Sequence, residues 1–195
     1  ILKARQMGFS TLTESILFKD TVTKFNRRTG IITHLDTATT NLFNMSKLMS
    51  LLFETNAFKV AEENNPFWYT SGKIGPYFIN ADYLYGSEQD SKDLLAFIDQ
   101  ELENESKTDI PEHIFKKVLD HYNTNEIYKY VIDQMKEYIE TNIGVENVDY
   151  ISGGERRDWY FSNIMAYLLN KPHVTIYKDL TTVVSTSDFT SSEPV

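Results

Sequence analysis

Two glycines and two arginines stand close together in the stretch Gly153-Gly154-Glu155-Arg156-Arg157. Glycines let the backbone approach a ligand closely, and their amide N–H groups can point at an anion. The forked guanidinium groups of the arginines are suited to a phosphate or a carboxylate. The residue types and their spacing therefore predict an anion site in this stretch.

The segments on either side would place this loop at the edge of a sheet. Residues 148–151 form a short apolar run, residues 159–169 are apolar over the length of a helix, and a second apolar run at 173–177 follows Pro172. Strand, Gly turn, helix and strand is the pattern of a βαβ unit, here 148–179. Open α/β sheets bind ligands at the carboxyl ends of their strands, and a helix N-terminus favours negative charge.

Two other interpretations of the loop are open at this point. In one, the loop is a Gly turn on the surface, where Arg156 and Arg157 pair with Glu155 and Asp158. In the other, the loop binds a dinucleotide. This is the least favoured of the three interpretations, because the GxGxxG pattern is absent.

Composition limits the class of protein. The 195 residues suffice for one α/β domain, or for one domain and a fragment of another. The absence of Cys excludes disulfides, Cys-ligated zinc and thiol catalysis. Neither a membrane span nor a signal peptide is evident, so we expect a cytoplasmic protein. Because the chain starts at Ile1 and ends in Ser/Thr-rich sequence, we also expect a fragment.

Charge is distributed unevenly along the chain. Residues 1–45 contain six Lys or Arg and three Asp or Glu, a net charge of +3. The total is −9, so the other 150 residues carry −12. Such an asymmetry indicates different partners or different origins for the two parts.

The N-terminal segment has some features of a phosphate-binding loop. Gly8, Ser10 and Thr11 fit the end of the standard P-loop, but Phe9 occupies the position of its Lys and the first Gly is missing. On physical grounds alone, an amphipathic helix with a polar N-terminus is the favoured interpretation.

The exact string adds a resemblance. KARQMGFST, followed by residues 28–34 and NLFNMSK, resembles the start of the ATPase domain of phage terminase large subunits, which package DNA. By this resemblance Arg5 or Lys3 would contact phosphate beside Gly8, and Ser10 or Thr11 would contact magnesium. Nucleic acid would be a partner only under this interpretation. The resemblance ends near residue 48 and no acidic Walker B strand follows, so we expect a terminase-like fragment at 1–48 rather than a working motor.

Residues 50–85 combine a helical pattern with two aromatic runs. Apolar residues from Leu51 to Val60 have helical spacing, and Pro66 prevents the helix from continuing. The runs 67–69 and 77–79 then flank a hairpin-like connection. Aromatics at this density favour core packing, and the alternative is a stacking wall for a flat ligand with a Lys beside it.

The string FWYTSGKIGPYFIN resembles the N-terminal hairpin of orotate phosphoribosyltransferases, and we place this hood at 66–85. Lys73 falls on the basic turn position of the family, and Gly75 replaces a Ser before Pro-Tyr-Phe. By the resemblance Lys73, Tyr77 and Phe78 would bind orotate.

Residues 87–143 are predicted to be helical and acidic. Ser87 with Asp90 can start one helix, Pro111 fits the first turn of a second, and Gly144 suits the C-cap of a third. We interpret His113 and His121 as surface residues rather than metal ligands, and no metal site is expected.

The segment ISGGERRDWYFSNIMAYLLNKPHVTIYKDL is similar to a divergent branch of the same family. Gly153, Gly154, Glu155, Arg156 and Arg157 would form its pyrophosphate loop, and Lys178 would contact the diphosphate. The resemblance implies an α/β fold for 49–195. We expect a type I phosphoribosyltransferase-like parallel sheet, C-terminally incomplete, with a helical insertion and a foreign N-terminal strand-loop-helix segment.

The resemblance also implies a reaction. Phosphoribosyl would pass from 5-phosphoribosyl 1-diphosphate (PRPP) to orotate, giving orotidine 5′-monophosphate and pyrophosphate. Mg²⁺ would be bound with PRPP, and Arg157 and Lys178 would neutralise the leaving group. The family further suggests a homodimer. The acidic strand that binds the ribose 5-phosphate is not found in this sequence, so we expect impaired turnover, and an inactive chimeric fragment is the remaining alternative.

Overall fold

The computed structural model describes residues 47–195 except Asn64 and Thr70. The described residues all belong to one compact unit, which spans Asn44–Val195. The nucleotide-binding residues expected from the terminase resemblance lie outside the described residues: Lys3, Arg5, Gly8, Ser10 and Thr11.

Two antiparallel strand pairs follow a helical segment at 47–54. Strand β1 (Phe58–Val60) pairs with β4 (Tyr77–Ile79), and β2 (Phe67–Trp68) pairs with β3 (Ile74–Gly75). The expected helix up to Val60 is therefore wrong beyond residue 54. Asn56 has a φ of 58°, a left-handed conformation that ends helices, and the residues after it become extended.

The two aromatic runs are not core, which corrects the favoured interpretation. They belong to different strand pairs, so they do not form one hairpin with each other. Trp68 is 75% exposed, and Tyr77 and Phe78 are also exposed. Their contacts are local: Tyr77 stacks on Phe58 with ring centroids 5.8 Å apart. A strand pair of two or three residues is too small to bury both of its faces.

The predicted helical region is confirmed. Its elements are α3 (Glu88–Asn104), α4 (Ile110–Thr124), α5 (Glu126–Tyr138) and the π-helical turn η3 (Ile139–Ile143), and short 3₁₀ turns flank it at η2 (Ala81–Tyr85) and η4 (Val145–Asn147). The Ser87 hydroxyl accepts a hydrogen bond from the Asp90 amide at 3.1 Å, as expected for an N-cap. Pro111 lies in the first turn of α4, and Gly144 ends η3 with a φ of 82°.

The two histidines of this region are half-buried, which corrects their assignment to the surface. His113 pairs with Glu101 on α3. The ring of His121 stacks on Tyr85 with centroids 4.0 Å apart, and its Nε2 contacts the Tyr85 carbonyl oxygen. Both rings therefore connect helices, a contact that residue spacing within one helix does not reveal.

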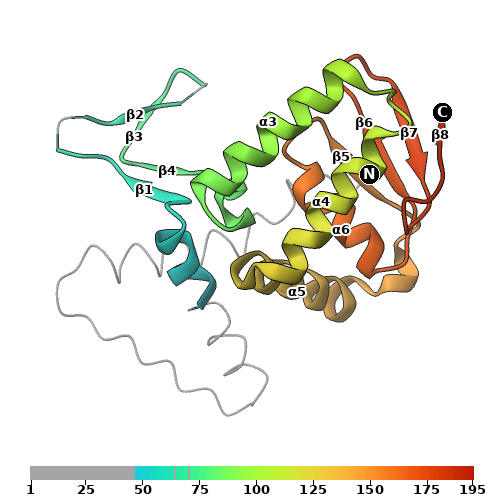
Figure 1. The fold of residues 1–195 in the computed structure, drawn as a ribbon. Coiled ribbons are helices and arrows are strands. Elements are labelled where there is room, and N and C mark those ends of the chain that lie inside the picture. The colour runs from blue at the N-terminus through green and yellow to red at the C-terminus, as the bar shows by residue number, and fades with distance from the viewer. Residues whose placement is uncertain (1–46, 64, 70) are drawn as a thin grey trace, which may run out of the picture. The chain divides into compact units, whose positions relative to one another are not determined.

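The main sheet has four strands in the order β5-β6-β7-β8 (Figure 1). They are β5 (Ile151–Gly154), β6 (His173–Ile176), β7 (Thr182–Ser185) and β8 (Ser192–Pro194), with α6 (Trp159–Leu168) between β5 and β6. The predicted βαβ unit and the α/β class are confirmed. The expected parallel sheet is confirmed only for β5 and β6, since β7 and β8 pair antiparallel.

A tight turn explains the antiparallel strands. The Leu180 amide donates to the Tyr177 carbonyl oxygen at 3.0 Å, and the Tyr177 amide donates to Thr181 at 2.9 Å. Leu180 has a φ of 68°. The chain thus reverses directly after β6, whereas a parallel neighbour needs a crossover of a dozen or more residues.

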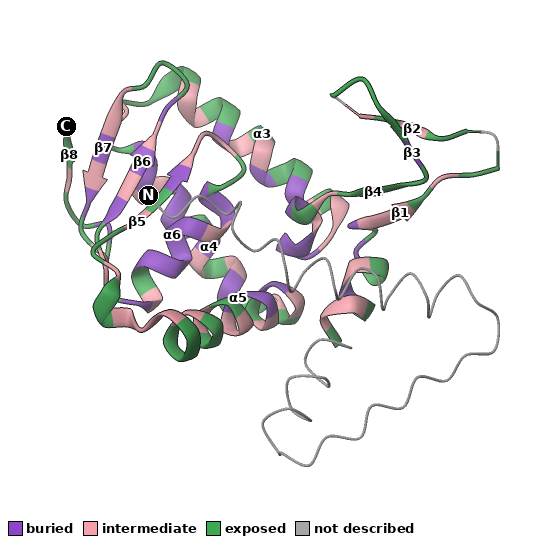
Figure 2. Cartoon of the chain, turned by 180° about the vertical axis from the view of Figure 1, so that it is seen from behind, coloured by how far each residue is buried: buried purple, intermediate pink, exposed green. Residues whose placement is uncertain are grey.

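Helix α6 is at the centre of the hydrophobic core and is buried along most of its length (Figure 2). It packs on β5 and β6, and α4 and α5 pack against it. Trp159, Tyr160 and Ile164 are fully buried there. Because its flanks are covered by a sheet and by helices, its sequence is apolar on nearly every side.

Candidate functional site

The Gly pair lies inside β5 rather than in a turn, which corrects the expected boundary. Gly153 pairs with Thr175 and Gly154 with Ile176 in the parallel ladder. Residues 148–150, the start of the predicted strand, precede β5. A Cβ on Gly153 would overlap the Ser162 hydroxyl and lie 3.1 Å from Trp159 Cδ1, so close helix packing requires glycine here.

The turn itself is residues 155–158, between the end of β5 and the start of α6. The Glu155 amide donates to the Ile176 carbonyl oxygen at 2.9 Å, and the Gly154 amide donates to the Asp158 carboxylate at 3.3 Å. Within the described residues, no acceptor binds the backbone N–H groups of residues 156–158. Three successive free amides before a helix N-terminus can bind an anion.

Both arginines of the turn contact carboxylates from other elements. Arg157 Nη1 lies 2.6 Å from Asp82 Oδ2 in η2, and Arg156 Nη1 pairs with Asp99 of α3. The alternative in which they pair with Glu155 and Asp158 is therefore wrong about the partners. The two arginines pair with residues of α3 and η2, which are distant in the sequence, rather than with their charged neighbours in the turn.

Glu155 instead binds Lys178, the residue expected at the end of the next strand. Its Oε2 accepts a hydrogen bond from the Lys178 amide at 2.9 Å, and its Oε1 lies 3.7 Å from Lys178 Nζ. Lys178 follows β6 by two residues and is exposed. Arg157 belongs to the β5–α6 turn itself, and Lys178, which follows β6, is joined to the same turn through Glu155.

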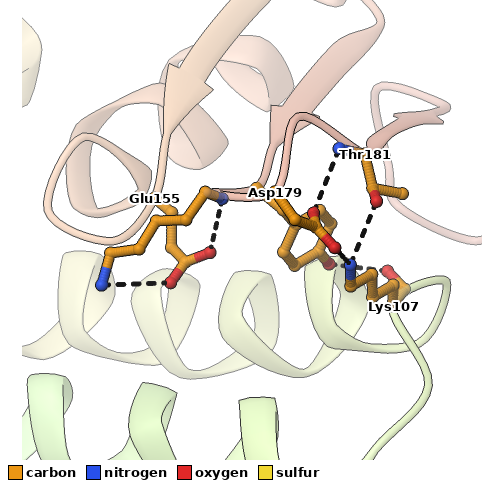
Figure 3. A network of polar contacts seen from close by, with 6 residues as sticks. Lys107, Glu155, Asp179 and Thr181 are labelled. Carbon is orange, nitrogen blue, oxygen red and sulfur yellow. Dashed lines mark hydrogen bonds and ion pairs between the residues drawn. The ribbon is translucent and has the colours of Figure 1, made fainter.

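A further ion pair, missed by the sequence analysis, lies beside the turn that follows β6. Lys107 pairs with Asp179 and also donates to the Thr181 hydroxyl at 3.1 Å, while Tyr177 donates to the Lys107 carbonyl oxygen at 2.7 Å. Figure 3 shows Glu155 and Asp179 beside the turn that follows β6. Lys107 lies about seventy positions earlier than its partners, so no local pattern could have identified it.

Two of these carboxylates have shifted pKa values, in opposite directions. Burial raises the pKa of Asp82 above its ordinary value, and the Arg157 guanidinium partly opposes this. The hydrogen bond from Lys107 lowers the pKa of Asp179 to about 2. We therefore expect the cation to stabilise the ionised form of each carboxylate. Arg157 does so for Asp82, whose burial disfavours the charge, and Lys107 does so for Asp179 through a hydrogen bond.

The residues expected to bind orotate lie on the small strand pairs. Lys73 is in the β2–β3 turn, and Tyr77 and Phe78 are in β4. Within the described residues, no hydrogen bond, ion pair or ring contact joins these three to residues 153–158 or to Lys178. A hollow of about 410 Å³ lies on this part, lined by Ala61, Glu62, Pro66, Ile74, Gly75 and Pro76.

The described residues contain no cluster of three or more His, Cys, Asp or Glu side chains that could hold a metal ion. None of their helices combines the length and apolar character needed to cross a membrane.

Comparison with known proteins found no family model and no curated protein that matches the chain.

Proposed function

We propose that this chain is an orotate phosphoribosyltransferase-like protein that binds the diphosphate group of PRPP at the β5–α6 turn. One observation carries the proposal. Arg157 is exposed in a turn whose residues 156–158 present three free amides at the end of a parallel strand, and the exposed Lys178 contacts Glu155 of the same turn. Cations, free amides and a helix N-terminus together favour a compact, multiply charged anion.

The proposed reaction suits these groups. Transfer of phosphoribosyl to orotate passes through a transition state in which diphosphate departs and positive charge develops on the ribose. Arg157 and Lys178 would stabilise the departing diphosphate, and no side-chain nucleophile is needed. Mg²⁺ would bind together with the diphosphate of the substrate. The protein would then not need its own set of carboxylate ligands for the ion.

The second substrate site is proposed from the resemblance of the strand pairs. Lys73 supplies a cation for the orotate carboxylate, and Tyr77 and Phe78 supply exposed rings that can stack on a flat base. The sequence holds no acidic ribose 5-phosphate strand. We therefore expect that binding of PRPP will be easier to detect than turnover.

Isothermal titration calorimetry with PRPP–Mg²⁺, orotate and ATP–Mg²⁺ tests the proposal. We expect PRPP to bind and Arg157→Ala to lower its affinity by about tenfold to a hundredfold, the effect of losing a hydrogen bond to a charged group. Lys116→Ala, which removes an exposed cation on α4, is the matched control and should leave affinity unchanged. A PRPP affinity that is unchanged in Arg157→Ala contradicts the site.

The string KARQMGFST favours a second candidate, an ATPase fragment of the phage terminase type. Under this alternative ATP–Mg²⁺ binds in the same titrations, and Arg5→Ala abolishes the binding. Binding of neither nucleotide nor PRPP would favour an inactive fragment.

A further inference from the structure

Two exposed cations, Arg157 of the β5–α6 turn and Lys178 after β6, are anchored in the same way. Arg157 has 59% of its side chain exposed, and its partner Asp82 only 12%. Lys178 has 70% exposed, and its partner Glu155 only 10%. In each pair a sheltered carboxylate holds a cation that still faces solvent.

The third pair at this turn has the opposite arrangement. The side chain of Arg156 is 30% exposed and that of Asp99 is 50% exposed. Here the more exposed group is the carboxylate, as in an ordinary surface ion pair. The low exposure of Asp82 and Glu155 thus distinguishes them from Asp99, a carboxylate that is close to the turn but exposed.

Both sheltered carboxylates are fixed to regular structure. Asp82 lies in η2, where its backbone amide donates to the capping oxygen of Asn80 at 3.4 Å. The backbone of Glu155 is bonded to Ile176 of β6, and its side chain is already bonded to the Lys178 amide. Each can therefore hold its cation in one place.

We propose that Asp82 and Glu155 are positioning residues, which hold Arg157 and Lys178 for a diphosphate-type anion without touching it. This inference rests on the proposed function. It also changes the role of Glu155, which the resemblance placed among the pyrophosphate ligands. A carboxylate repels an anion, and both Glu155 oxygens face Lys178.

Physical chemistry explains why such an anchor favours binding. A guanidinium has five donors, and the contact with Asp82 Oδ2 leaves others for a ligand. If Arg157 moved away, a buried charge would lose its partner, which is costly, so Arg157 stays. A side chain held in place loses less conformational freedom when the anion binds.

Titration with inorganic pyrophosphate and Mg²⁺ tests the inference on the full chain. We expect Asp82→Asn and Glu155→Gln each to lower the affinity about tenfold, through loss of preorganisation. Asp99→Asn removes the same charge from the same neighbourhood, and we expect its affinity to be equal to wild type or tighter. If Asp82→Asn and Glu155→Gln behave like Asp99→Asn, the inference is wrong.

A double-mutant cycle separates positioning from general structural damage. In an Arg157→Ala background, Asp82→Asn should no longer lower the affinity, because the residue that it positions is gone. Glu155→Gln should likewise have no effect in a Lys178→Ala background, which keeps the test available if Asp82→Asn does not fold. An equal loss with and without the cation overturns the inference.

The outcomes also distinguish this inference from the proposed function. A wild-type chain that does not bind pyrophosphate overturns both. Pyrophosphate binding that is insensitive to the two carboxylates overturns only the positioning role. Sensitive binding of pyrophosphate without any effect of orotate supports the positioning role and overturns the orotate specificity.

Discussion

Four cations near the β5–α6 turn each contact a carboxylate, and burial determines what each pair can do. Arg157 and Lys178 are held by sheltered groups and remain accessible, whereas Arg156 and Lys107 contact exposed carboxylates. Exposed ion pairs contribute little to stability. At the scale of single residues, the burial of the carboxylate partners therefore distinguishes the four ion pairs better than their number does.

His173 is the buried titratable residue whose effect on stability is easiest to test. It is fully buried, its Nε2 lies 2.9 Å from the Ser162 hydroxyl, and its Nδ1 lies 3.0 Å from the Thr175 hydroxyl. Burial lowers its pKa from 6.5 to about 3, because the charged form is poorly solvated. The folded chain thus keeps this ring neutral at pH values where the unfolded chain binds a proton.

The free energy of unfolding should consequently fall as the pH drops below 6.5. The contribution of His173 is complete above pH 6.5 and is lost as the pH falls toward 3, with a loss of about 2 kcal/mol between pH 7 and pH 5. Urea unfolding at these two pH values measures it. In His173→Gln the free energy of unfolding should differ less between pH 7 and pH 5 than in the wild type. An equal difference in the two proteins would show that His173 is not responsible.

At the scale of elements, the packing of α6 on β5 determines where the turn begins. Gly153 lies in a buried row of the sheet with Thr175 and Val183, against the start of α6. The Trp159 indole donates to the Gly153 carbonyl oxygen at 3.1 Å. Close packing keeps the Gly pair extended in β5, so the turn starts only at Glu155.

The two glycines offer a matched pair of substitutions. Gly153→Ala should lower the free energy of unfolding by about 1–3 kcal/mol, because its methyl group would overlap Ser162. Gly154→Ala should change it by less than about 1 kcal/mol, since its nearest neighbour would be Asp158 Oδ2 at 3.4 Å. Thermal or urea unfolding measures both, and equal effects would contradict the packing described for Gly153.

At the scale of the whole described unit, one large core joins helices to the main sheet. Residues from α3, α4, α5, α6, β7 and the β6–β7 turn contribute to it. The small strand pairs β1–β4 and β2–β3 are outside it, and many of their apolar side chains are exposed. Stability should therefore depend on the core around α6 and very little on those pairs.

Two isoleucines test this division. Ile164 in α6 is fully buried, and Ile79 in β4 is 52% exposed. Ile164→Ala should lower the free energy of unfolding by about 2–5 kcal/mol, the usual range for such a truncation in a core. Ile79→Ala should cost less than about 1 kcal/mol. Comparable losses from the two, measured by urea unfolding, would show that the strand pairs belong to the cooperative core.

Local features of the sequence predicted the helices and the βαβ unit correctly. Ser87, Pro111 and Gly144 marked helix ends because capping depends on residues within one turn of each other. The stretch 153–157 likewise identified the turn as a candidate anion site, because its glycines and arginines are neighbours along the chain. Periodicity did not separate the helix at 47–54 from β1, since a left-handed residue such as Asn56 leaves little trace in the apolar pattern.

By itself the sequence determined the helices of 87–143, the βαβ unit, the capping residues and the chemical types available at the turn, because each of these depends on neighbours along the chain. Only the tertiary structure decided the partners of the charges and the direction of the last strands. Asp82 meets Arg157, and Lys107 meets Asp179, across about seventy residues. Such pairings depend on which surfaces the core brings together, and no local spacing encodes them.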